Sequence, residues 1–263
     1  MTSNEKNDKL LEVLLSRTNA ERQSIVRNYQ KLFNKSILLE IPDINMQSMK
    51  LFIQDMLTDT SMLLADELNK AMKTSDLQLV TSILIDFWGD EFNQVESVYR
   101  IYTNKSIWQH INNSFGVTVK NILRCTVMTR KHELKLDNPI KEKVKTTGKD
   151  LSAFIENNTN GLMRDVLIAM LNHSVNKPMY FATIIHDAIH KNQTNTSTVH
   201  RLLISRSEID LYTINKEYKV KYGKYLLDDV KKTFDGIYGK FLAKLLQNKN
   251  YQNLLAIDTV VFL

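Results

Sequence analysis

The chain of 263 residues has few of the residues that interrupt helices or cross-link small folds. It contains 7 glycines, 3 prolines and a single cysteine. One cysteine cannot form an intrachain disulfide, so we expect a reducing compartment. Because glycine and proline are rare, while Leu, Ile, Lys and Glu recur at helical spacing over long segments, the sequence predicts an all-α protein with short connections.

Long apolar runs are also missing. No segment approaches the roughly 20 residues that a membrane-spanning helix needs, and the first residues, MTSNEKNDK, lack the apolar core of a signal peptide. We therefore expect a cytoplasmic protein. Its net charge of +6 favours anionic partners such as lipid headgroups or nucleic acid. The most basic segment, 130–149, is interpreted as a solvated linker, with lipid or nucleic-acid contact as alternatives, and we expect no nucleic-acid partner.

What the sequence does contain is an internal repeat. Four stretches align without a gap: NKSILLEI from Asn34, NKSIWQHI from Asn104, GKDLSAFI from Gly148 and GKYLLDDV from Gly223. Each begins with Gly or Asn followed by an anchor lysine. The residues 14, 17 and 18 positions after that lysine are apolar or aromatic in all four copies, and tyrosine stands six positions before it in three. A recurring pattern of this kind predicts a repeat architecture.

The fourth copy shows the expected helices most clearly. Apolar spacing places them at 180–190, 199–206 and 207–218, with Leu226 and Val230 on a fourth and Tyr238 to Leu245 on a fifth. Ser207 and Asp210 have the spacing of a capping box that would start the third helix, and Gly223 would end it in a left-handed cap. In the second copy the template predicts helices at 63–72, 80–85, 92–102, 106–111 and 119–128.

The other two copies are shorter. The first begins at its second helix, 9–16, and the third keeps only 150–155 and 163–171 as clear helices. The register divides the chain into a first repeat over 1–60 lacking its first helix, a second over 61–128, a truncated third over 129–178, a fourth over 179–249 and a C-terminal tail over 250–263. Because the short third repeat would expose Leu151, Ile155 and Leu167, we expect a partner or an oligomer there.

These stretches resemble the annexins, whose repeat is a five-helix module normally present four times. The similarity covers residues 2–248. It is most specific in LLISRSEIDLYTINKEYKVKYGKYL (Leu202–Leu226) and LLSRTNAERQSIVRNYQKLF (Leu14–Phe33). The resemblance implies annexin-like repeats of up to five helices in a curved disc. The chain is also similar to the alpha-giardins, annexin-like proteins with altered calcium loops.

The resemblance further implies calcium-dependent binding to acidic phospholipids. The family's loop, Met-Lys-Gly-x-Gly-Thr, pairs its carbonyls with a carboxylate nine residues after the anchor lysine, which suits an ion that takes 6–8 oxygen ligands. Here the corresponding loops, 72–76 and 190–194, have no glycine, and the carboxylate positions hold Ile44, Ser114, Asn158 and Thr233. Asp43 and Asp235 are weak, off-register candidates. We therefore expect Ca²⁺ binding to be weak or absent.

Two functions follow as expectations. The first is a peripheral membrane protein that binds an acidic phospholipid surface. Its membrane-facing loop residues would be Lys73, Thr74, Lys191, Asn192 and Thr194. The second is a structural scaffold with the same fold that binds the cytoskeleton or another protein. Arg17 and Arg206, each 18 residues before an anchor lysine, are expected to be structural donors to carbonyls at helix ends; the alternative is a place in an ion pathway.

An enzyme is not expected. His186 and His190 share a helix face, as the ligands of zinc hydrolases do, but that motif requires Glu as its second residue and a further ligand. Cys125 stands between Leu123 and Val127, and we expect a buried, unreactive thiol.

Overall fold

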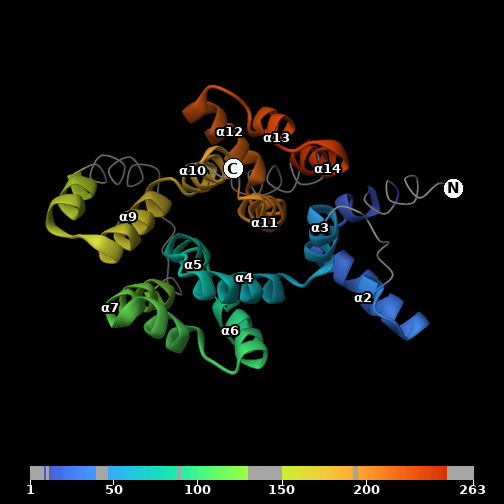
Figure 1. Ribbon diagram of the computed structural model, residues 1–263, viewed down its shortest axis with the longest axis horizontal. Coiled ribbons are helices and arrows are strands. Elements are labelled where there is room, and N and C mark those ends of the chain that lie inside the picture. The colour runs from blue at the N-terminus through green and yellow to red at the C-terminus, as the bar shows by residue number, and fades with distance from the viewer. Residues whose placement is uncertain are drawn as a thin grey trace, which may run out of the picture. The chain divides into compact units, whose positions relative to one another are not determined.

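The structure is a computed structural model that describes residues 9, 12–39, 47–87, 90–129, 150–191 and 195–247. Every regular element in these ranges is helical, which confirms the expected all-α class (Figure 1). The chain divides into two compact units. One consists of Met1–Asp59 and Phe181–Leu263, and the other of Thr60–Tyr180.

The first unit joins the two ends of the sequence. Its elements are α2 (Asn19–Phe33), the short 3-10 helix η1 (Ile37–Leu39), α3 (Gln47–Leu57), most of α10 (Lys177–His190), α11 (Thr196–Arg206), α12 (Leu211–Tyr222), α13 (Leu226–Thr233) and α14 (Gly236–Gln247). Its core forms where α3 packs against α11 and α14. There the buried rings of Phe52 and Tyr238 meet edge to face at 6.2 Å, and His200 Nε2 lies 2.5 Å from Asp55 Oδ2.

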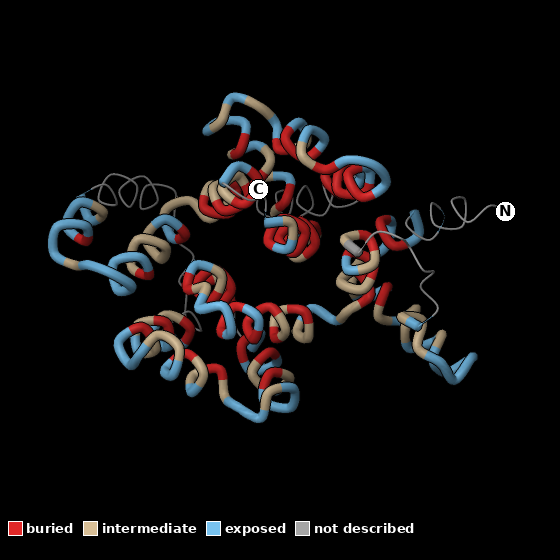
Figure 2. The backbone as a smooth tube through the Cα atoms, in the orientation of Figure 1, coloured by how far each residue is buried: buried red, intermediate tan, exposed pale blue. Residues whose placement is uncertain are grey.

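The second unit contains α4 (Thr60–Thr74), α5 (Leu77–Leu84), α6 (Glu91–Thr103), α7 (Ile107–Thr129), a helix over 150–158 and α9 (Gly161–Val175). Helix α4 packs along α6, and α5 packs against α9. Figure 2 shows the buried faces of these helices. Helix α7 is broken at Gly116, whose φ of 86° and ψ of 171° lie outside helical values. Its two halves correspond to the two separate helices expected at 106–111 and 119–128.

The Gly or Asn of the repeat pattern has a conformational cause. Asn34, Asn104 and Gly223 each end a helix with a positive φ, of 51°, 55° and 73°. In each case the backbone N–H donates to the carbonyl four residues earlier at 2.9 Å. Glycine and asparagine are the residues that adopt this left-handed cap at least cost. The cap expected at Gly223 is confirmed, while Gly148 of the third copy lies outside the described residues.

The repeated tyrosine also has a structural role. Tyr99 and Tyr218 are fully buried. Each is hydrogen-bonded to the residue five positions after the next anchor lysine: Tyr99 to His110 Nδ1 at 2.6 Å, and Tyr218 to the carboxylate of Asp229. The two copies therefore tie consecutive helices together at the same register position but with different partners. In the first copy, Tyr29 instead packs against the ring of Phe33, with centroids 4.6 Å apart.

Two local expectations were wrong. Ser207 does not cap α12: its hydroxyl donates back to the carbonyl of Ile204 at 2.7 Å, and the carboxylate of Asp210 accepts from Arg206 instead. Cys125 is exposed, not buried, because Leu123 and Val127 on the same helix occupy the core-facing positions.

Around the short third repeat, the expected exposure holds only in part. Leu151 is 43% exposed, whereas Ile155 is buried and Leu167 is half-buried.

Candidate functional site

The connection between α4 and α5 is the more fully described of the two expected membrane-facing loops. It consists of Ser75 and Asp76. Ser75 has a left-handed φ of 53°, and its N–H donates to the carbonyl of Met72 at 3.4 Å. The N–H of Asp76 donates to the carbonyl of Ala71 at 2.9 Å. The Asp76 side chain caps α5 by accepting the N–H of Leu79 at 2.9 Å.

This connection is closed on itself. The hydroxyl of Thr74 also turns back, donating to the carbonyl of Lys70 at 3.1 Å. The carbonyls of Lys70, Ala71 and Met72 therefore accept bonds from the protein, and the loop's one carboxylate is engaged in capping. A calcium loop needs such oxygens as ligands for the ion. Lys73 and Thr74 lie exposed beside the connection.

The connection between α10 and α11 ends in the same manner. Asn195 caps α11 by accepting the N–H of Thr198 at 3.0 Å, and its own N–H donates to the carbonyl of Ala188 at 2.7 Å. Lys191 is exposed, and its Nζ lies 3.1 Å from Asp187 Oδ2. The expected membrane-facing residues Asn192 and Thr194 lie outside the described residues.

The positions where the family has a carboxylate carry no charge. Ser114, Asn158 and Thr233 occupy them, and the Asn158 side chain donates to the carbonyl of Phe154 at 2.8 Å. Of the two weak candidates, Asp43 lies outside the described residues and Asp235 is exposed at the start of α14. Within the part of the chain that the structure describes, no three His, Cys, Asp or Glu side chains cluster so as to hold a metal ion.

The two arginines expected to be structural lie in different environments. Arg206 is buried and holds both oxygens of Asp210, at 2.7 and 2.6 Å, and its guanidinium lies 4.5 Å from the ring centroid of Phe181. The side chain of Arg17 is half exposed, 3.7 Å from Glu21 across one helical turn.

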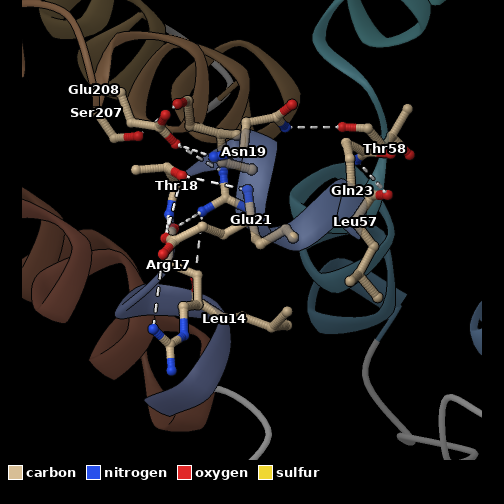
Figure 3. A network of polar contacts seen from close by, with 12 residues as sticks. Leu14, Arg17, Thr18, Asn19, Glu21, Gln23, Leu57, Thr58, Ser207 and Glu208 are labelled. Atoms are coloured by element: carbon tan, nitrogen blue, oxygen red, sulfur yellow. Dashed lines mark hydrogen bonds and ion pairs between the residues drawn. The ribbon is translucent and has the colours of Figure 1, made fainter. Parts of the chain in front are cut away.

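Near Arg17, the buried position belongs to Arg22. Its guanidinium is 1% exposed and donates to the carbonyls of Leu14 and Arg17 and to Glu208 Oε1, the last at 3.0 Å. Figure 3 shows Leu14, Arg17 and Glu208 in this network, with Glu208 also accepting the N–H of Asn19 at 2.7 Å. Sequence reasoning missed Arg22 because its partners include a residue 186 positions away.

A second polar cluster lies at the end of α10, next to its loop. The rings of His186 and His190 stack at 4.3 Å, and His186 stacks on Tyr222 at 3.7 Å. Burial and the neighbouring charge of His190 lower the pKa of His186. Lys224 Nζ lies 2.6 Å from Asp229 Oδ1. Although burial alone would raise it, the hydrogen bonds from Lys224 and Tyr218 lower the pKa of Asp229.

None of the described helices combines the length and apolar character needed to cross a membrane.

A sequence model of the Annexin family matches residues 2–43 and 180–245. Mouse (Mus musculus) annexin A10 is 27% identical, over 89% of this chain and 85% of its own length. The solved structure of annexin III superposes with a TM-score of 0.80 at 22% identity, covering 92% of this chain and 88% of its own. Calcium-bound alpha-14 giardin has the same fold, with a TM-score of 0.74 at 12% identity and coverage of 93% and 95%.

The family match falls on the first and fourth copies of the repeat, which hold the left-handed caps at Asn34 and Gly223 and the network around Arg22. The fold likeness extends over nine-tenths of the chain. With its all-α architecture and its glycine-free loops, the chain is similar to the annexins in sequence and fold, as a divergent relative of that family.

Proposed function

We propose that this protein is a peripheral membrane protein that binds acidic phospholipid surfaces, and that calcium contributes little or nothing to that binding. The family and the net charge of +6 support the first part. The observation that carries the second part is the closed α4–α5 connection, where the carbonyls of Ala71 and Met72 and the side chain of Asp76 bond within the protein.

A calcium ion and a lysine side chain place different demands on this connection. A calcium ion needs 6–8 oxygen ligands, and opening this connection would break the Asp76 cap as well as the bonds to Ala71 and Met72. A lysine needs only a nearby phosphate, and near an anionic membrane each contributes on the order of 1 kcal/mol. Lys73 already supplies that charge in an exposed position.

The second loop supports the same reading. The side chain of Lys191 is 65% exposed while it pairs with Asp187. Exposed pairs of this kind are weak, typically below about 1 kcal/mol. Lys191 can therefore exchange its carboxylate partner for a lipid phosphate at little cost.

Liposome co-sedimentation tests the proposal. We expect the protein to pellet with phosphatidylserine vesicles equally well in calcium and in chelator, and to be released by salt, because Lys-to-phosphate attraction is screened. The double variant Lys73→Glu, Lys191→Glu should bind several-fold more weakly. The matched control Lys31→Glu, Lys240→Glu makes the same change of net charge at two exposed lysines on the sides of α2 and α14; it should bind more tightly than the loop variant.

The results that contradict the proposal are distinct. Pelleting only with calcium would show that a calcium site forms despite the closed loop. Equal loss in the loop and control variants would show that net charge, not these loops, governs binding.

A second candidate function is a scaffold that binds another protein. It is favoured by four exposed apolar side chains on the 150–158 helix and the first turn of α9: Leu151, Phe154, Leu162 and Met163, which are 39–62% exposed. No pelleting with vesicles in either condition, together with co-sedimentation with polymerised tubulin, would favour this candidate over the first.

A further inference from the structure

A cleft in the second unit has the chemistry of an anion site. It lies along α7, has a volume of about 470 Å³ and is lined by Lys105, Trp108, Gln109, Asn112, Lys120 and Arg124. Clefts of this size are typical of small-ligand sites. We propose that it binds a compact ligand bearing two or more phosphate groups, either free in solution or as the headgroup of a lipid.

The kink at Gly116 creates the cleft. Because Gly116 takes a φ of 86°, which favours glycine, the helix stops and restarts. Lys105 and Gln109 are four residues apart and line the cleft before the kink; Lys120 and Arg124 are also four apart and line it after the kink. Lys120 and Arg124 share a face of the second half of α7. Lys105 lies in the bend that precedes α7, and Gln109 lies in its first turn, so cations from both sides of the kink line the same cleft.

Among the described residues, no acidic side chain offsets the charge of the cleft. No Asp or Glu lines it, and within the described residues no carboxylate pairs with Lys105, Lys120 or Arg124. Elsewhere in the described chain, basic side chains commonly have such partners, as Arg100 has Glu96 at 2.7 Å and Lys177 has Asp86 at 2.5 Å. Three like charges around one hollow raise the local positive potential and concentrate anions there.

A neighbouring titratable group reflects that potential. Burial first, and then the charges of Lys105 and Lys73, lower the pKa of His110 on the same helix. The polar lining suits phosphate as well. The amide oxygen of Gln109 accepts the N–H of Ser106 at 3.2 Å, which leaves its NH₂ as a donor, and Asn112 adds a second amide. Guanidinium and ammonium groups with amide donors match the oxygens of a phosphate ester.

Trp108, which lines the cleft, can report ligand binding through its fluorescence. Trp108 is held in place by stacking on the buried ring of Phe92, with centroids 5.0 Å apart. The other tryptophan of the chain is Trp88, so a Trp88→Phe protein reports fluorescence from the cleft alone. Neither Lys73 nor Lys191 lines the cleft, so this inference does not depend on the proposed function.

The test titrates inorganic pyrophosphate into Trp88→Phe protein without lipid or divalent cations, at constant ionic strength. We expect a saturable change of Trp108 fluorescence. On that background, Lys120→Gln and Arg124→Gln should each weaken binding on the order of tenfold, the loss of one charged hydrogen bond. Lys120→Arg should retain most of it, and Lys240→Gln on α14 should leave it unchanged.

A second arm distinguishes the source of the phosphate. Vesicles with phosphatidylinositol bisphosphate are compared with phosphatidylserine vesicles of equal surface charge. A preference for the bisphosphate that is lost in Arg124→Gln indicates a lipid headgroup; pyrophosphate binding without that preference indicates a soluble ligand. If neither probe gives a saturable effect that Lys120→Gln and Arg124→Gln reduce, while circular dichroism shows those variants folded, the proposal is overturned.

Discussion

Replacing Arg22 by alanine should destabilise the first unit far more than replacing its neighbour Arg17. The Arg22 guanidinium is 1% exposed and donates to Glu208 Oε1 and to the carbonyls of Leu14 and Arg17. Its removal leaves these acceptors without their donor and part of a charge pair uncompensated. Breaking a buried pair by removing one partner costs about 3–5 kcal/mol.

Arg17 is a matched control for Arg22. Arg17 lies five residues away in the same segment and carries the same charge, but its side chain is 52% exposed and pairs with an equally exposed Glu21. Solvent and salt screen such a pair, so Arg17→Ala should change stability little.

The assay is urea denaturation followed by circular dichroism, with thermal melting as a second measurement. For a chain of this size, about 3–5 kcal/mol corresponds to a fall in Tm of roughly 10 °C. Glu208→Gln alone should cost less, because the amide can still accept from Arg22, and the two changes together should be less than additive. If Arg22→Ala is no more destabilising than Arg17→Ala, the reasoning about this network is wrong.

Two further predictions concern local features. The pKa of His186 is lowered in the folded protein, so His186 contributes most to stability above its unfolded pKa, and stability should fall as the pH drops below about 6.5. The variant His186→Phe keeps an aromatic ring on Tyr222 and should flatten that fall in melting curves. An unchanged pH profile would refute this prediction. Gly223→Ala should lower the free energy of unfolding by about 1 kcal/mol, because φ is 73° there. Gly223→Asn, which introduces the residue found at the two other described caps, should lower it clearly less. Equal losses of stability in urea denaturation would contradict this explanation of the cap.

The helices could be predicted because their causes are local. The caps at Asn34, Asn104 and Gly223 follow from the φ that these residues tolerate, and the apolar faces follow from helical spacing. The features that the sequence did not predict depend on contacts with other parts of the structure. Arg22 was overlooked because the partner that matters, Glu208, comes from the other end of the chain, and the capping box failed because Arg206 competes for the carboxylate of Asp210.

The cleft along α7 could not be predicted for a related reason. Taken one at a time, Gln109, Lys120 and Arg124 look like ordinary solvated helix positions, and Lys105 looks like an ordinary residue of a short connection. Only the break at Gly116, a glycine with an open Cβ direction and a φ of 86°, brings them to one hollow. Periodicity predicted two helices here but carried no information on how their polar faces meet.

The repeat itself suggests where function has diverged. Positions that set backbone conformation or fill the core are retained: the left-handed caps, and the buried tyrosines at Tyr99 and Tyr218. The tyrosines' partners have changed from histidine in one copy to aspartate in the other while the bond persists, so packing tolerates chemical change there as long as one acceptor remains. The loops have no such requirement. In the α4–α5 connection, the carbonyls of Ala71 and Met72 and the carboxylate of Asp76 bond within the protein, so this connection keeps its conformation without a metal ion.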